Sequence, residues 1–330
     1  MSVNYIFVGG SGRSGTSYLA ALLGKSPHIS SINDVELKFF GENGGLPDLY
    51  HALVLHYSLT RSVLAIKNFR ILFHRLFASY YQNQATLDHS IDEQSASSIL
   101  EDYIAYLCSG EENFPREITS RYFNKRTRQF VSHLYEAIEN DTNSLNKHLQ
   151  LVDRSSDSQA SKISAKVQYR LEKTPHNLLN ARLLNQIFDN PRFVHVTRDP
   201  RAVVFSLQQM SWAPDSLEEC VEWYRCYNDS WLREKLRLEL EGTQVLSMAI
   251  EDLHSSPMET MRNLNSYLAL DTPIELYNFD FETLTAVQRK IEPRILSVAT
   301  ELLSEELHMA GYCLDQVGIF QNSGNFRQSA

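Results

Sequence analysis

The pattern of apolar positions predicts that the chain begins with a buried strand followed by a helix. Residues 5–8 form a short β-branched and aromatic run, and Leu19, Leu22 and Leu23 recur at helical spacing. A glycine-rich turn, residues 9–15, separates the two elements. A turn of this kind points backbone N–H groups and a helix N-terminus at one anion, typically a phosphate.

The turn carries its own cation. The spacing from Gly10 to Gly15 fits the first part of a nucleotide P-loop, but Thr16 stands where that motif requires lysine. The cation is instead Arg13, inside the loop. A tight turn without a ligand is the alternative. Four glycines together with an arginine and hydroxyls exceed what a turn needs, so the pattern favours a phosphate-binding loop.

Further apolar runs alternate with helical periodicity along the chain. Strands are predicted at 29–32, 167–171, 193–197 and 245–250, and helices at 177–188, 217–240 and 257–268. Residues 46–165 are predicted to be mostly helical, and the polar tail 321–330 to be disordered. We therefore expect one α/β domain over residues 1–330, with a central parallel sheet, helices on both faces and a helical insertion at 46–165.

Composition narrows the class of protein. A chain of 330 residues can bury one large α/β core, and its net charge of −9 argues against general affinity for nucleic acid. The four cysteines form no CxxC pair, so we expect reduced thiols and no metal site built from them. No signal peptide and no apolar stretch of bilayer length are visible, which predicts a cytoplasmic protein without a membrane span.

The loop resembles a known family. Residues 12–17, Gly-Arg-Ser-Gly-Thr-Ser, are similar to the 5′-phosphosulfate loop of sulfotransferases that use 3′-phosphoadenosine 5′-phosphosulfate (PAPS). The Arg-Ser-Gly-Thr form is typical of carbohydrate, tyrosyl-protein and many bacterial members. Since eukaryotic members with this loop are usually Golgi-anchored, the lack of an anchor favours a bacterial enzyme, with a trimmed lumenal domain as the alternative. The resemblance implies that the donor's 5′ end is bound by six residues: Gly12, Arg13, Ser14, Gly15, Thr16 and Ser17.

A second stretch resembles the same family's 3′-phosphate motif. Arg198 ends the strand predicted at 193–197, and Ser206 follows eight residues later on the next helix. A guanidinium can grip a dianionic phosphate through two hydrogen bonds, and the serine hydroxyl adds a donor. Asp199 suits the N-cap of that helix, and Arg201 either adds positive charge or forms a salt bridge with an acidic neighbour.

Two further residues are candidates for the chemistry. By the resemblance, Glu36 occupies about the position of the family's catalytic base, although Asp34 and Glu42 are close competitors. Lys173 lies in a Lys-Thr-Pro run at the carboxyl end of a predicted strand, where the family's lysine reaches the sulfuryl group. Together with Arg13 it would stabilise charge on the sulfuryl and bridging oxygens. The alternatives are a solvated loop glutamate and a surface lysine.

The sequence thus predicts a sulfotransferase with a P-loop-like fold and a helical acceptor-side insertion. It would move a sulfuryl group from PAPS to a hydroxyl of a glycan, lipid, small molecule or carrier-bound acyl chain, and release adenosine 3′,5′-bisphosphate. The family requires no metal, and the sequence shows no metal site. A P-loop small-molecule kinase and a non-catalytic nucleotide-binding relative remain alternatives. A kinase would have no use for Arg198 and Ser206, because ATP lacks a 3′-phosphate.

Overall fold

A central parallel sheet of five strands organises the chain, in the order β2-β3-β1-β4-β5. The computed structural model describes residues 3–32, 36–82, 92–108, 114–150, 167–274 and 291–317. The strands are β1 (Asn4–Gly9), β2 (Ile29–Ser31), β3 (Tyr169–Lys173), β4 (Arg192–Thr197) and β5 (Val245–Ala249). The predicted α/β class is confirmed. The predicted tail at 321–330 and the candidate base Asp34 lie outside the described residues.

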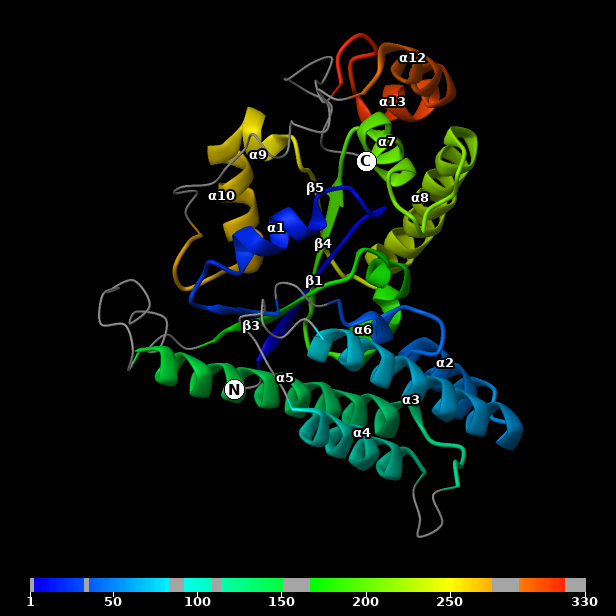
Figure 1. The fold of residues 1–330 in the computed structure, drawn as a ribbon, viewed down its shortest axis with the longest axis vertical. Coiled ribbons are helices and arrows are strands. Elements are labelled where there is room, and N and C mark those ends of the chain that lie inside the picture. Colours follow the sequence, from blue (N-terminus) through cyan, green and yellow to red (C-terminus); the bar gives the residue numbers. More distant parts are fainter. Residues whose placement is uncertain are drawn as a thin grey trace. The chain divides into compact units, whose positions relative to one another are not determined.

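Helices connect these strands (Figure 1). They are α1 (Thr16–Leu23), α2 (Leu46–Tyr50), α3 (Leu59–Gln82), α4 (Glu93–Cys108), α5 (Ser120–Gln150), α6 (Ala181–Ile187), α7 (Pro200–Gln208), α8 (Leu217–Leu240), α9 (Asp252–Ser255), α10 (Pro257–Leu268), α12 (Pro293–Leu302) and α13 (Ser304–Ala310). Short 3₁₀ helices span Lys38–Phe40 and Pro175–Asn180, and a π-helical turn spans His51–Leu55.

The chain divides into two compact units. The first unit contains residues 1–7 and 27–192, and the second contains residues 8–26 and 193–330. The first holds β2, β3 and helices α2 to α6, and the second holds β4, β5, α1 and the remaining helices.

In the first unit, a layer of helices is joined to the sheet by polar contacts from β3. Strands β2 and β3 pair in parallel, and α3, α4 and α5 lie side by side (Figure 1). The hydroxyl of Tyr135 on α5 donates to the carbonyl of Leu171 at 3.0 Å, and Arg170 forms a two-pronged ion pair with Glu139. The helical character predicted for 46–165 is confirmed over its described part.

Two element boundaries in the first unit differ from the prediction. The strand predicted at 167–171 occupies Tyr169–Lys173. Apolar and polar residues alternate from Val167 to Glu172, but the polar side chains within β3 are buried as well, so the alternation does not mark where the strand begins or ends. The helix predicted at 177–188 starts as the 3₁₀ turn Pro175–Asn180, and only Ala181–Ile187 is α-helical. Short 3₁₀ turns commonly precede α-helices, and their side chains fit the same apolar periodicity.

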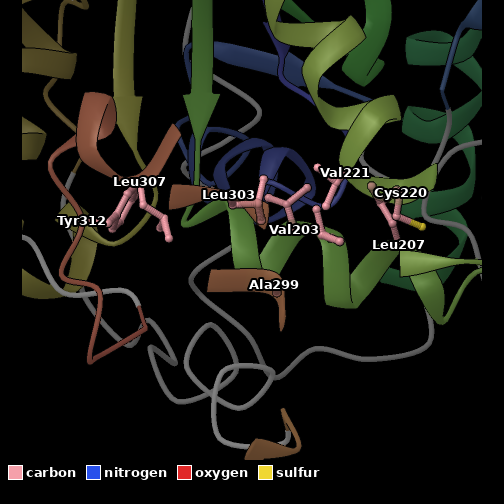
Figure 2. Packing of buried hydrophobic residues seen from close by; sticks show 9 residues of the cluster. Val203, Leu207, Cys220, Val221, Ala299, Leu303, Leu307 and Tyr312 are labelled. Carbon is pink, nitrogen blue, oxygen red and sulfur yellow. The ribbon is translucent and has the colours of Figure 1, made fainter. Parts of the chain in front are cut away.

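The second unit is built around the parallel pair β4 and β5, with Phe193 opposite Val245 and Thr197 opposite Ala249. The same unit contains an apolar core built by α7, α8, α12, α13 and the residues that adjoin the last two helices (Figure 2). Its buried side chains are Val203, Val204, Leu207, Cys220, Val221, Ala299, Leu303, Leu307 and Tyr312. The predicted helices 217–240 and 257–268 are confirmed as α8 and α10. A capping box between Ser216 and Glu219 fixes the start of α8.

Candidate active site

The loop between β1 and α1 has a backbone suited to binding an anion. Gly12, Arg13 and Gly15 all have left-handed conformations, with φ of 75°, 57° and 97°. A positive φ is uncommon for a residue with a side chain, and Arg13 has this conformation inside the loop. The first intrahelical bond of α1 is donated by the Leu19 amide to the Gly15 carbonyl, so the amides of the first turn need acceptors outside the helix.

The loop also approaches β4 very closely. A Cβ atom on Gly10 would lie 2.5 Å from the Val196 carbonyl oxygen and 2.3 Å from Ser14 Oγ, so only glycine fits there. Ser14 is fully buried, and its hydroxyl has no hydrogen-bond partner among the described residues. A buried hydroxyl without a partner is costly, and an oxygen of a bound phosphate would satisfy it.

The two sequence motifs meet through Arg13. Its Nε donates to Ser206 Oγ at 2.9 Å, and Arg198 Nη1 donates to the Arg13 carbonyl at 3.2 Å. Arg198 follows the end of β4 and Ser206 lies on α7, and both are buried, whereas Arg13 is exposed. Arg13 was predicted to act at the sulfuryl end of the donor, and the structure places its guanidinium beside the serine predicted for the 3′-phosphate.

A buried ion pair supports the start of α7. Asp199 caps the helix by accepting the Arg201 amide at 2.9 Å, as predicted. Arg201 is fully buried and forms an ion pair with Asp199 at 2.8 Å. Of the two roles predicted for it, the salt bridge with an acidic neighbour is therefore the one observed. The same guanidinium donates to the carbonyls of Cys313 and Leu314, each at 2.7 Å. Arg201 therefore holds the C-terminal segment against the turn that carries Arg198.

Glu251, two residues after the end of β5, supports the same turn. One of its oxygens accepts the Asp199 amide at 2.9 Å, and the other accepts the Tyr312 hydroxyl at 3.1 Å. Burial raises the pKa of Glu251 to about 7, while the Asp199 amide and the charge of Arg198 oppose the rise.

In the first unit, Glu36 and Lys173 contact each other. Lys173 Nζ lies 3.0 Å from Glu36 Oε1. The Lys173 side chain is almost buried at the end of β3, and Glu36 is partly exposed just before the 3₁₀ turn Lys38–Phe40. The competing residue Glu42 instead pairs with Lys38 one helical turn away.

Beside this pair lies a buried carboxylate that the sequence analysis did not single out. Glu172 of β3 accepts the Leu37 amide and the Thr174 hydroxyl, each at 2.8 Å, and also the Asn177 side-chain amide. Burial raises the pKa of Glu172 to about 8, against the opposing effect of the Thr174 and Leu37 hydrogen bonds. A glutamate directly before a candidate lysine at a strand end is the sequence signal that could have identified it.

Residues 5–273 match the model of the sulfotransferase family. The chain belongs to the sulfotransferase family. The match includes both motifs, Glu36 and Lys173. A family of sulfotransferases consists of group-transfer enzymes, which agrees with the class predicted from the sequence. No curated protein matches the chain.

Solved structures of sulfotransferases also resemble this one. The sulfotransferase domain from the curacin biosynthetic pathway is 15% identical, with 92% of this chain and 98% of that chain covered and a TM-score of 0.43. The domain from the Synechococcus PCC 7002 olefin synthase is 16% identical, with coverages of 90% and 84% and a TM-score of 0.44. A sulfotransferase from Mycobacterium avium is 15% identical, with coverages of 96% and 79% and a TM-score of 0.40.

None of the helices in the described ranges is long and apolar enough to cross a membrane. Within the same ranges, no three His, Cys, Asp or Glu side chains are grouped to hold a metal ion.

Proposed function

We propose that this sulfotransferase moves a sulfuryl group from PAPS to an acceptor hydroxyl by in-line displacement. The observation that carries the proposal is the contact between Arg13 and Ser206, together with the bond from Arg198 to the Arg13 carbonyl. It joins the loop that we assign to the 5′-phosphate to the side chains that we assign to the 3′-phosphate. A nucleotide that carries phosphate at both its 5′ and 3′ positions uses both groups, whereas ATP uses one.

The residues present fit the two phosphates of the donor. The loop amides, the hydroxyls of Thr16 and Ser17 and the unpartnered hydroxyl of Ser14 would bind the 5′-phosphate, because its oxygens accept several hydrogen bonds at once. Arg198 and Ser206 would bind the 3′-phosphate. Arg13, which contacts Ser206, would lie between the two and balance charge at either end.

Glu36 and Lys173 are assigned to the chemistry. Glu36 would accept the proton of the acceptor hydroxyl while that oxygen forms its bond to sulfur. The bond between sulfur and the bridging oxygen of the 5′-phosphate would break in the same step, and Lys173 would stabilise the charge that develops on that oxygen. The 3.0 Å contact between the two side chains supports their joint assignment.

The test is calorimetric binding of adenosine 3′,5′-bisphosphate, compared with ATP and magnesium. We expect the wild type to prefer the bisphosphate, and Arg198→Ala to weaken that binding by about 100-fold, since a buried charged contact to phosphate is lost. Arg233→Ala, which removes an exposed arginine from α8, is the matched control and should change nothing. Preference for ATP, or indifference to Arg198, would contradict the proposal and favour a kinase.

A second measurement separates a catalyst from a relative that only binds nucleotide. Sulfur-labelled PAPS is incubated with a panel of sugars, lipids, phenols and carrier-bound acyl chains, and transfer to each is measured. Glu36→Ala should retain the affinity for the bisphosphate and lose transfer. A chain that binds the bisphosphate but transfers sulfate neither to the panel nor to water would be non-catalytic.

A further inference from the structure

Glu172 connects two segments that are far apart in sequence. Its Oε1 atom accepts the backbone amide of Leu37, 135 residues away, and the hydroxyl of Thr174. Its Oε2 atom accepts the side-chain amide of Asn177, from the 3₁₀ turn that follows β3. The side chain is therefore held by three donors, and the residue is only 2% exposed.

These donors stand next to the candidate catalytic residues. Leu37 directly follows Glu36, and Glu172 directly precedes Lys173. Holding the Leu37 amide therefore fixes the backbone one residue from Glu36 to the strand end that bears Lys173. Glu36 and Leu37 themselves lie in no helix or strand, so the bond to Glu172 is what ties this part of the backbone to β3, next to the 3.0 Å contact between Glu36 and Lys173.

Core packing does not explain a carboxylate at this position. Burying an ionised glutamate carries a large desolvation cost, which is what raises the pKa of Glu172, and the side chains that bond it are neutral donors. An apolar side chain would remove that cost, but it would leave the Leu37 amide, the Thr174 hydroxyl and the Asn177 amide without this acceptor. The carboxylate is thus suited to orienting its neighbours.

We propose that Glu172 is a positioning residue, which anchors the segment of Glu36 to the end of β3 and so holds Glu36 beside Lys173. The role rests on the proposed function, because it acts through the candidate base. Glu172 itself is not expected to touch the donor or the acceptor.

The first test measures the hydrogen bond to the Leu37 amide directly and needs no enzymatic activity. Hydrogen exchange is followed by mass spectrometry in a peptide that contains the Leu37 amide, in wild type, Glu172→Gln and Glu172→Ala. We expect protection in wild type and in Glu172→Gln, whose side-chain oxygen still accepts, and loss of protection in Glu172→Ala. Equal protection in all three proteins would overturn the anchor, whether or not the chain is a sulfotransferase.

The second test uses kinetics with PAPS and the acceptor that the panel identifies, or water in its place. Glu172→Ala should lower kcat by about 30-fold with little change in the KM for PAPS, since small misplacements of a catalytic group have effects of this size. Glu172→Gln should restore most of the activity. Glu136→Ala, at an exposed acidic position of α5, is the control.

A double-mutant cycle separates positioning from general damage. If Glu172 acts through Glu36, Glu172→Ala should have no further effect on kcat in a Glu36→Gln background. An undiminished effect there, or an unchanged kcat in the single variant, would overturn the role.

If Glu172→Ala fails to fold, Thr174→Val removes one donor at constant volume, and its kcat should fall only when Glu36 is intact. A wild type that turns over no PAPS would contradict the proposed function instead.

Discussion

Arg13 and Ser206, 193 residues apart in the sequence, are joined by a 2.9 Å hydrogen bond from the arginine Nε to the serine hydroxyl. The bond connects the loop after β1 with helix α7, so the residues predicted for the two ends of the donor form one cluster. A bound phosphate that forms a hydrogen bond with Arg13 or with Ser206 must therefore also change the position of the other side chain.

The first prediction concerns Ser206. Replacing it with alanine should weaken the binding of adenosine 3′,5′-bisphosphate by about tenfold, the cost of one hydrogen bond to a charged group. The binding of adenosine 5′-phosphate should not change, because that nucleotide lacks the 3′-phosphate. Calorimetry with both nucleotides provides the measurement.

Ser247→Ala, which removes an exposed hydroxyl from β5, is the control and should leave both affinities intact. An equal loss of affinity for the two nucleotides in Ser206→Ala would mean that Ser206 serves the loop through Arg13. Its assignment to the 3′-phosphate would then be wrong.

The second prediction concerns the close approach at Gly10. In Gly10→Ala the new methyl group would meet Ser14 Oγ at 2.3 Å and the Val196 carbonyl at 2.5 Å, and the second contact is with backbone that cannot turn away. We expect a destabilisation of about 3 kcal/mol and loss of nucleotide binding, since the loop must move. Urea unfolding and calorimetry measure the two effects.

Gly242→Ala is an instructive control for Gly10→Ala. Gly242 has a φ of 81°, but nothing lies within 4 Å of its Cβ position. This variant should lose about 1 kcal/mol through backbone strain and keep nucleotide binding. Normal binding by Gly10→Ala would show that the loop tolerates displacement from β4, against this prediction.

Much of the second unit could be predicted from local patterns. Asp199 and Pro200 mark the start of α7, and α8 has the predicted ends, because capping residues and apolar periodicity act over a few residues. The limits of β3 could not be predicted, since its polar side chains, Arg170, Glu172 and Lys173, are buried together with the apolar ones, and the alternation of apolar and polar residues extends beyond the strand.

The candidate site was predictable in its residues but not in its contacts. Arg13 and Ser206 each belong to a recognisable motif, yet their hydrogen bond depends on how two distant segments pack. Glu172 belongs to no motif that periodicity could reveal, because its role arises only when the Leu37 amide reaches it. Local rules identify the elements that carry these groups, whereas tertiary packing selects the partners.

The third prediction concerns the buried ion pair. Arg201→Met should reduce the free energy of unfolding by about 3–5 kcal/mol, because the buried Asp199 would lose its ion pair with Arg201. The carbonyls of Cys313 and Leu314 would lose their donor as well. Urea unfolding monitored by tryptophan fluorescence measures the loss.

Arg225→Met is the control for Arg201→Met. Arg225 pairs with Glu222 and Glu306, but its side chain is partly exposed, so we expect a loss of less than about 1 kcal/mol. If the two variants lost similar amounts of unfolding free energy, the buried pair of Arg201 and Asp199 would stabilise the fold no more than an exposed pair does.

The fourth prediction is a pH dependence that Glu251 imposes on stability. Because burial raises the pKa of Glu251 in the folded chain from its usual 4.5 to about 7, the folded state retains the proton over this interval while the unfolded state releases it. The stabilisation from this group is therefore fully present below about pH 4.5 and is lost as the pH rises through 7. The total effect is about 3 kcal/mol by linkage.

Glu251→Gln removes this titration and retains the contacts. Its side-chain oxygen can accept the Asp199 amide, and its NH₂ group can donate to the Tyr312 hydroxyl. The variant and wild type should be about equally stable near pH 4.5, and the variant should be the more stable above pH 7. Urea unfolding across this range measures the difference, and Glu301→Gln, an exposed position on α12, should show no such trend. A difference that instead favours wild type above pH 7 would mean that the charge of Arg198 outweighs burial and holds Glu251 ionised.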